Sequence, residues 1–233
     1  MCSRYSLTSP HEAVRKTFGY KNAPVFPPRY NIAPTQPVAI VRLDAKAERE
    51  LQLVRWGLIP SWVKDPRKFT VLINARAETV LEKPSFRAGM RYRRCLVPAD
   101  GFYEWTGPKG AKRPHLIRPE ANHRSAAAGP IAFAGLWDHW LGADGSEMES
   151  MAILTVAANA DVAPLHDRMP AILTPSTFEG WLDCRACPAE AAAAMLQPAA
   201  PGLLESLEVS QKLSNARNEG PEVQTPAHSD RLI

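Results

Sequence analysis

Residues 131–157 hold two apolar runs, Ile131-Ala132-Phe133-Ala134-Gly135-Leu136-Trp137 and Met151-Ala152-Ile153-Leu154-Thr155-Val156-Ala157. A polar segment with the turn dipeptide Asp144-Gly145 separates them. Apolar runs of this length, bounded by turn signals, are typical of core strands, and Asp-Gly commonly joins such strands. We therefore expect two core strands here.

Further strand patterns precede this pair. Val38–Val41 and Leu51–Leu58 are separated by a charged turn and predict a hairpin. Residues 95–105 predict another strand, and residues 70–79 begin as an apolar run and then turn polar. The proline-rich residues 24–37 predict an ordered, extended loop.

Helical patterns are short and lie outside these strands. His11–Phe18 follows Pro10 and carries Val14 and Phe18 on one face, and residues 189–197 are rich in alanine. We expect residues 106–129 to form a long exposed loop and residues 224–233 a flexible tail. The pattern predicts a single-domain α+β protein, rich in strands, with a curved sheet core and peripheral helices.

Composition limits the class of protein. The 233 residues are 45% hydrophobic and 22% charged, with 22 prolines, as expected of a globular chain with many turns. The net charge of +4 is compatible with a polyanionic partner. No apolar run approaches the ~18 residues of a membrane span, and no signal peptide pattern is present. We expect a cytoplasmic protein without disulfides among its four cysteines.

Cys2 directly follows the initiator Met1, so loss of Met1 would expose an N-terminal cysteine. Such a residue carries an amine of pKa about 7.7–8.0 next to a thiol of pKa about 8.5. The amine can condense with an aldehyde, and the thiol can then close a five-membered thiazolidine ring. The alternative is that Cys2 is a buried packing residue.

Three polar groups are further candidates for a site. Asn74, Arg76 and Glu78 end an apolar run and share one face if the strand continues. Glu104 lies between Tyr103 and Trp105, either facing outward or held in an apolar pocket with a raised pKa. His166-Asp167-Arg168 lies between prolines, where a proton donor and a phosphate-binding fork would be rigid, although a lone histidine is often structural.

Two other patterns are less specific. Arg87, Arg91, Arg93 and Arg94 form the densest basic cluster, either a solvated helix or a face that follows phosphates. Cys184 and Cys187 form a single CxxC without further ligands nearby, so we expect neither a metal nor another cofactor.

Six motifs in order resemble the SOS response-associated peptidase family, whose members shield abasic sites in single-stranded DNA. The resemblance runs from residue 2 to about residue 223, which we take as the domain. The motifs are Cys2 with Arg4, Arg29–Pro34, Trp56–Trp62, Asn74–Thr79, Gly101–Trp105 and His166–Pro170.

The resemblance implies a role for each matching residue. Cys2 would form the thiazolidine, Asn74 would orient Cys2 and the sugar, Glu104 would act as acid and base on the amine, and His166 would move the proton as the sugar opens. Arg76 and Arg168, with Arg4, would hold phosphates. Many members have glycine where this chain has Ser3, which carries a Cβ and does not freely adopt positive φ.

Aromatic side chains could add contacts to unstacked bases. Trp56, Trp62 and Trp105 are candidates for stacking, with core packing as the alternative.

The sequence thus predicts a monomeric abasic-site sensor, active on single-stranded DNA and associated with the nucleoid on damage. Two alternatives stay open. One is a cysteine autopeptidase or amidohydrolase with His166 as base, and the other is a non-covalent single-strand binder in which Cys2 is incidental.

Overall fold

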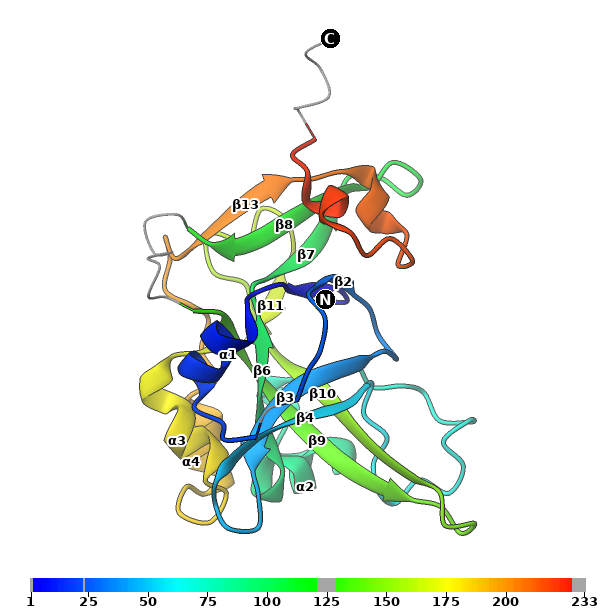
Figure 1. The fold of residues 1–233 in the computed structure, drawn as a ribbon, viewed down its shortest axis with the longest axis vertical. Helices are drawn as coiled ribbons and strands as arrows, with labels where there is room; N and C mark the ends of the chain where they lie inside the picture. Colours follow the sequence, from blue (N-terminus) through cyan, green and yellow to red (C-terminus); the bar gives the residue numbers. More distant parts are fainter. Residues whose placement is uncertain (1, 23, 121–128, 228–233) are drawn as a thin grey trace.

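Strands dominate the computed structural model, which describes residues 2–22, 24–120 and 129–227. They form an eight-stranded and a five-stranded sheet. Figure 1 shows the larger sheet below and the smaller one above it, with the N-terminus between them. Buried side chains from both sheets make one continuous apolar core.

Part of the larger sheet closes into a barrel. Its strands pair in the order β10, β4, β3, β6, β9, and β9 pairs again with β10. Their bounds are β3 (Pro37–Leu43), β4 (Arg49–Trp56), β6 (Arg94–Ala99), β9 (Ile131–Leu141) and β10 (Glu147–Ala157). The expected hairpin is confirmed, since β3 pairs antiparallel with β4, and the two expected core strands are confirmed as β9 and β10, which also pair antiparallel. The mixed α+β class with a barrel-like sheet is confirmed as well.

Close packing between β6 and β9 depends on Gly135. A Cβ at this position would lie 2.8 Å from the Cys95 sulfur and 2.8 Å from a methyl carbon of Val97, distances that real side chains do not adopt. Phe133 and Met151 are fully buried on the strands beside it. The apolar runs therefore form strands because the barrel buries them.

Short strands extend the barrel at the end nearest the smaller sheet. β5 (Asn74–Arg76) runs parallel to β10, and β11 (Arg168–Pro170) runs antiparallel to it. β12 (Ile172–Leu173) pairs with β9. β10 thus pairs with two short strands, β5 and β11, that contain polar residues of the sequence motifs.

The smaller sheet has the order β13-β8-β7-β1-β2. Its strands are β1 (Tyr5–Leu7), β2 (Arg29–Ile32), β7 (Gly101–Thr106), β8 (Arg113–Pro119) and β13 (Leu204–Glu208). One face packs on the barrel, where the Tyr5 ring meets Trp56 edge-on at 5.2 Å between centroids. The other face holds the C-terminal part of the chain through Tyr103, Leu213 and Val223.

Helices cover the outside of the barrel. The α-helices are α1 (His11–Phe18), α2 (Pro84–Tyr92), α3 (Phe178–Leu182) and α4 (Ala189–Ala194). Short 3-10 turns are η1 (Ala77–Thr79), η3 (Pro175–Thr177), η4 (Gln211–Ser214) and η5 (Pro221–Gln224). The expected first helix is confirmed, and it ends at Gly19, whose φ of 66° is left-handed.

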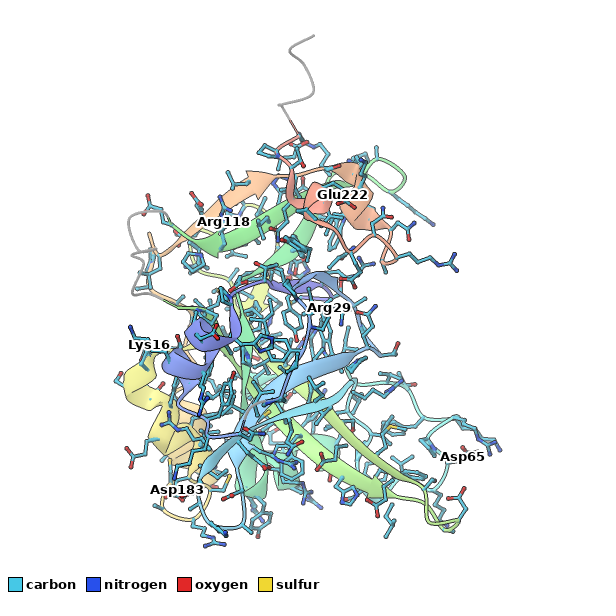
Figure 2. All side chains as sticks on the ribbon, in the orientation of Figure 1. Lys16, Arg29, Asp65, Arg118, Asp183 and Glu222 are labelled. Carbon is cyan, nitrogen blue, oxygen red and sulfur yellow. The ribbon has the colours of Figure 1, made fainter. Side chains whose placement is uncertain are left out.

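Two of these helices are joined by a pair of stacked aromatic rings. Phe18 of α1 stacks on Phe178 of α3 at 5.5 Å, which fixes the two helices together on one side. Figure 2 shows Lys16 and Asp183 on this helical side and Asp65 on a loop at the opposite side. In the described part of the chain, no helix is long and apolar enough to cross a membrane.

Three expectations about irregular segments are wrong in part. The region read as a loop from residue 106 contains β8, and the proline-rich segment contains β2. The tail is ordered as far as residue 227, because Ser210 donates to the Thr225 carbonyl and Ala227 donates to the Glu208 carbonyl. Residues 121–128 and 228–233, to which the rest of these expectations applies, lie outside the described residues.

The basic cluster after residue 86 divides between surface and core. Arg94 begins β6 and is 2% exposed, so it belongs neither to a solvated helix nor to a face that follows phosphates. Its guanidinium donates to the carbonyls of Met90, Trp181, Asp183 and Cys187 at 2.6–3.0 Å. Arg93 pairs with the largely buried Asp138. These two arginines are structural.

Candidate functional site around Cys2

Cys2 lies where the smaller sheet meets the barrel. It precedes β1 and is fully buried. The Asn74 amide nitrogen donates to the Cys2 carbonyl oxygen at 2.7 Å. Because β5 aligns Asn74 with Ile153 of β10, the barrel itself holds this contact.

The Cys2 thiol is protonated in this environment. Burial raises its pKa, and the charge of Glu104 adds to the rise. The thiol donates to the Arg4 carbonyl at 3.6 Å, and this contact and the positive amino terminus of the chain oppose the shift. The expected removal of Met1 concerns a residue outside the described range.

Glu104 is the buried carboxyl group of the site. Strand alternation on β7 directs Phe102 into the main core and Tyr103 to the opposite face, so Glu104 points toward the barrel. It is 5% exposed. Burial raises its pKa to about 7, although the charge of the amino terminus and a hydrogen bond to it lower that pKa. Of the two interpretations of Glu104, the apolar pocket is therefore the one observed.

His166 lies between β10 and β11. Burial lowers its pKa, the positive amino terminus lowers it further, and Asp167 opposes both effects. The Arg168 backbone N–H donates to His166 Nδ1 at 2.9 Å. When Nδ1 accepts this hydrogen bond, the neutral ring carries its proton on Nε2. Asp167 Oδ1 also lies 2.7 Å from Nδ1, a contact that suits the protonated ring.

The three groups converge on one point. Cys2, Glu104 and His166 come from the chain start, β7 and the β10–β11 loop, yet the charge of the amino terminus shifts the pKa of each. Coulomb interactions between charges weaken with distance, so all three groups are electrostatically coupled to the same end of the chain. The site thus combines an aminothiol segment with a carboxyl group and an imidazole.

The expected phosphate-binding arginines differ in their surroundings. Arg76 is exposed on β5. Arg168 is 12% exposed at its side chain and donates to both Glu78 carboxylate oxygens, at 2.5 and 2.9 Å. Arg168 also donates to the Thr155 carbonyl at 2.6 Å. A phosphate at Arg168 would have to compete with Glu78.

The tryptophans separate into core and surface. Trp56 is fully buried and donates to the Ile73 carbonyl at 2.9 Å, so the expectation that it contacts DNA is wrong for this structure. Trp62 is 58% exposed and meets the Phe69 ring edge-on. Trp105 is half-buried, with its Nε1–H donating to Ser214.

Sequence reasoning missed Lys112 and the role of Asn31. The charge of Lys112 lowers the pKa of both Glu104 and His166, but this lysine lies in a stretch without a strong pattern. Asn31 is fully buried within a proline-rich motif, and a polar residue there was the available signal. No cluster of three potential metal ligands occurs among the described residues.

Together, the fold and candidate site define a β-barrel protein with a buried cysteine at the second position of its chain. The chain belongs to the SOS response associated peptidase (SRAP) family, whose sequence profile matches residues 1–216. The resemblance inferred from the six motifs is thereby confirmed.

Two abasic site processing proteins support the same family assignment. The abasic site processing protein YoqW of Bacillus subtilis (strain 168) is 35% identical over 228 residues, covering 96% of this chain and 98% of YoqW. The abasic site processing protein HMCES of Gallus gallus is 35% identical over 224 residues, covering 85% of this chain and 66% of HMCES.

Solved structures share the fold. A crystal structure of a Bacteroides thetaiotaomicron protein superposes with a TM-score of 0.82 at 28% identity, covering 96% of this chain and 99% of that one. A Bordetella bronchiseptica protein gives a TM-score of 0.75 at 28% identity, covering 90% of this chain and all of that one.

Proposed function

We propose that this protein captures abasic sites in single-stranded DNA by forming a thiazolidine with Cys2 after Met1 is removed. The observation that carries this proposal is the fixed position of Cys2, whose carbonyl accepts a hydrogen bond from Asn74. The charge of the amino terminus also affects the pKa of Glu104 and of His166. The names of the relatives supply the substrate class.

The chemistry needs an aldehyde, which the ring-opened abasic sugar provides. The neutral Cys2 amine attacks the aldehyde carbon, and loss of water from the resulting carbinolamine gives an iminium ion. The Cys2 sulfur then attacks the same carbon, the electron pair of the C=N bond moves onto the nitrogen, and the thiol proton is released, which replaces the proton consumed when water left. One aldehyde and one aminothiol thus give a thiazolidine and one water, with no oxidant or metal required.

Glu104 and His166 suit the two proton transfers. A carboxyl group with a pKa of about 7 both gives and takes protons near neutral pH, so Glu104 would serve the amine and the departing water. As the sugar ring opens, the proton of its anomeric hydroxyl passes to the ring oxygen, and the neutral His166 ring would relay it by accepting one proton and donating another. Asn74 would hold the Cys2 backbone throughout.

Two exposed side chains suit contact with a single strand. Arg76 is exposed and would contact phosphate, and the exposed Trp62 would stack on a base. Arg168 would contribute once Glu78 is displaced.

A thiol-dependent peptide hydrolase fits the site less well. Such an enzyme needs a thiolate, whereas burial raises the pKa of Cys2 and its thiol donates to a backbone carbonyl. In the thiazolidine route the amine reacts first, and the thiol only has to close a ring.

The test is a denaturing gel of the purified protein with a single-stranded oligonucleotide that bears one abasic site. Intact mass first establishes that Met1 is absent. We expect a heat-stable, slower band for the native protein, with the summed mass less one water, and none for Cys2→Ala. If the processed protein gives no such band, the proposal is wrong; retained DNA binding would then favour a non-covalent binder.

A further inference from the structure

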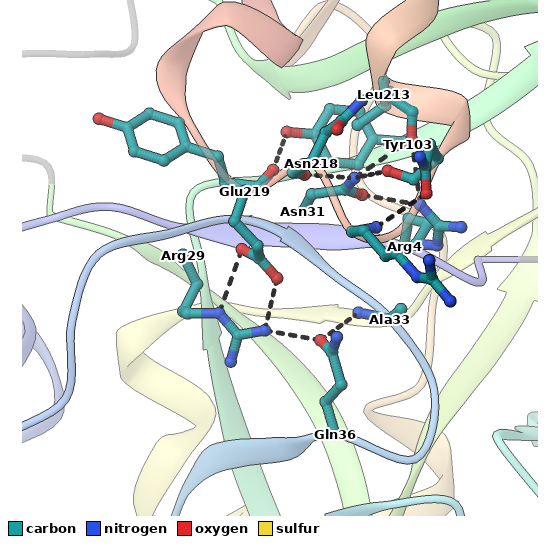
Figure 3. A network of polar contacts seen from close by, with 12 residues as sticks. Arg4, Arg29, Asn31, Ala33, Gln36, Tyr103, Leu213, Asn218 and Glu219 are labelled. Atoms are coloured by element: carbon teal, nitrogen blue, oxygen red, sulfur yellow. Dashed lines mark hydrogen bonds and ion pairs between the residues drawn. The ribbon is translucent and has the colours of Figure 1, made fainter.

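The side chain of Arg4 takes part in a polar network. Its Nη1 donates to Asn31 Oδ1 at 2.8 Å and to the Leu213 carbonyl at 3.1 Å. Both hydrogens of that nitrogen are thus used. Figure 3 shows Arg4, Asn31 and Leu213 in contact, with Asn218 and Glu219 beside them.

Asn31 connects Arg4 to residues 211–219, which we call the C-terminal strap. Its amide nitrogen donates to three strap carbonyls, those of Leu213, Asn215 and Asn218, at 2.9–3.2 Å. Asn31 is fully buried, so this amide has exchanged water for the strap and for Arg4. A buried amide with these partners fixes its surroundings, because a hydrogen bond lost at a buried side chain is costly when water does not replace it.

Arg4 in turn determines the position of Cys2. Its carbonyl oxygen accepts the Tyr103 backbone N–H at 3.0 Å and the Cys2 thiol at 3.6 Å. Only Ser3 separates the two residues. A displacement of Arg4 would therefore move the backbone that presents the aminothiol.

We propose that Asn31 is a positioning residue, which holds Arg4 against the C-terminal strap and thereby fixes the segment that presents Cys2. This inference rests on the proposed capture of abasic sites. It assigns to Arg4 a supporting role in place of the phosphate contact expected from the sequence. Arg29 provides a matched control, because it also holds the strap, through Glu219 at 2.7 Å, but does not contact Arg4 in any described hydrogen bond.

The experiment measures covalent capture in a single turnover, with Asn31→Ala, Arg4→Met, the double variant and Arg29→Met. Varying the oligonucleotide concentration separates the maximal rate from the concentration that gives half of it. We expect Asn31→Ala and Arg4→Met each to lower the maximal rate about 10-fold or more, because small misplacements of a nucleophile are costly. The double variant should be no slower than the slower single variant, since both changes break one connection.

Binding readouts distinguish positioning from phosphate contact. We expect the half-saturating concentration and the salt dependence of non-covalent binding to stay within about 2-fold of the native values in every variant, and Arg29→Met to keep the native rate within about 2-fold. If Arg4→Met instead lowers the salt slope by about one phosphate contact at an unchanged maximal rate, Arg4 is a phosphate ligand and the inference is overturned. Independent, multiplying effects of the two changes would overturn it as well.

Hydrogen exchange supplies a readout without DNA. We expect Asn31→Ala to speed exchange in residues 2–7, and Arg29→Met to leave that exchange unchanged. Unchanged exchange in Asn31→Ala contradicts the inference. If the native protein forms no covalent product, the proposed function fails, while the exchange result still decides whether Asn31 holds this segment. Arg4→Met keeps every contact between Asn31 and the strap, so it remains decisive if Asn31→Ala does not fold.

Discussion

The side-chain amide of Asn74 donates to the backbone carbonyl of Cys2 at 2.7 Å, so the barrel holds the segment that leads into the smaller sheet. The two sheets are therefore joined by a directional contact at the candidate nucleophile, in addition to apolar packing.

Asn74→Asp tests that contact. The new carboxylate would face the Cys2 carbonyl oxygen without a donor, which repels the segment. We expect covalent capture at least about 10-fold slower, measured by the denaturing gel. Asn22→Asp is the matched control, because Asn22 also donates to a carbonyl at 2.7 Å, that of Leu51, far from the site in sequence. An equal loss in both variants would indicate a general effect on folding.

Glu104→Gln tests the raised pKa. Burial raises the pKa of the Glu104 carboxyl group from 4.5 to about 7. Between these pH values the native state therefore keeps a proton that the unfolded chain loses. The stability of the native protein therefore falls as pH rises from about 4.5 to about 7. We expect the variant to gain up to about 3 kcal/mol relative to the native protein between pH 5 and pH 8, measured by urea unfolding. The same difference at both pH values would contradict the shift.

The rate of covalent capture should also depend on the protonation of Glu104. We expect the rate of covalent capture by the native protein to change near pH 7, and this change to be absent in Glu104→Gln. A change of the same size and midpoint in the variant would assign it to another group, such as the amine.

Glu78→Gln releases Arg168 from its carboxylate partner. The Arg168 hydrogen bonds lower the pKa of Glu78, so the carboxylate is charged at neutral pH and competes with phosphate. We expect tighter binding of single-stranded DNA and a salt slope steeper by about one contact, measured by fluorescence anisotropy. Glu82→Gln, an exposed change nearby in sequence, should alter binding less. Weaker binding by Glu78→Gln would show that the ion pair itself builds the DNA surface.

Trp62→Ala and Trp56→Phe should separate binding from stability. Loss of the exposed Trp62 ring is expected to weaken single-strand binding about 5-fold or more, with little change in unfolding. Trp56→Phe removes a hydrogen bond to Ile73 and leaves a small cavity, so we expect a loss of about 2 kcal/mol in the free energy of unfolding. If Trp56→Phe weakened DNA binding while Trp62→Ala changed only the stability, Trp56 would have to become exposed when DNA binds.

Arg94→Met should damage the fold and leave the chemistry of the folded fraction intact. Four backbone carbonyls would lose their donor at once, and we expect a cost of about 3 kcal/mol or more in urea unfolding. Arg91→Met is exposed at the end of α2 and should change stability by about 0.5 kcal/mol or less. A stable Arg94→Met would show that water replaces the guanidinium.

Local patterns predicted the hairpins but not the closure of the barrel. The β3–β4 and β9–β10 pairs follow from apolar runs around short turns, whereas the parallel contact of β10 with β4 joins Ser150 to Arg55, which no local signal connects. β8 escaped prediction because Arg113 and Pro114 stand where a strand usually carries β-branched residues. β8 forms a strand because it pairs with β7, although its composition does not favour one.

The motifs indicated which residues to consider for the candidate site, but not how buried those residues are or which partners they contact. The motifs indicated Glu104, but alternation along a strand does not say which face is covered. Trp56 and Trp62 belong to one motif, yet one ends a buried strand and the other lies in an exposed loop. The pairing of Arg168 with Glu78 joins residues 90 positions apart, so the sequence offered a free arginine where the structure has an ion pair.

The connection between Asn31 and the C-terminal strap also sets an order in time. Cys2 is among the first residues that the ribosome makes, and the carbonyls that anchor Asn31 belong to residues 213–218, which are among the later ones. Contacts so distant along the chain close only after nearly all of it has been synthesised. On the proposed role of Asn31, a nascent or truncated chain carries Cys2 without the contacts that align it, and these contacts form only after residues 213–218 have been made.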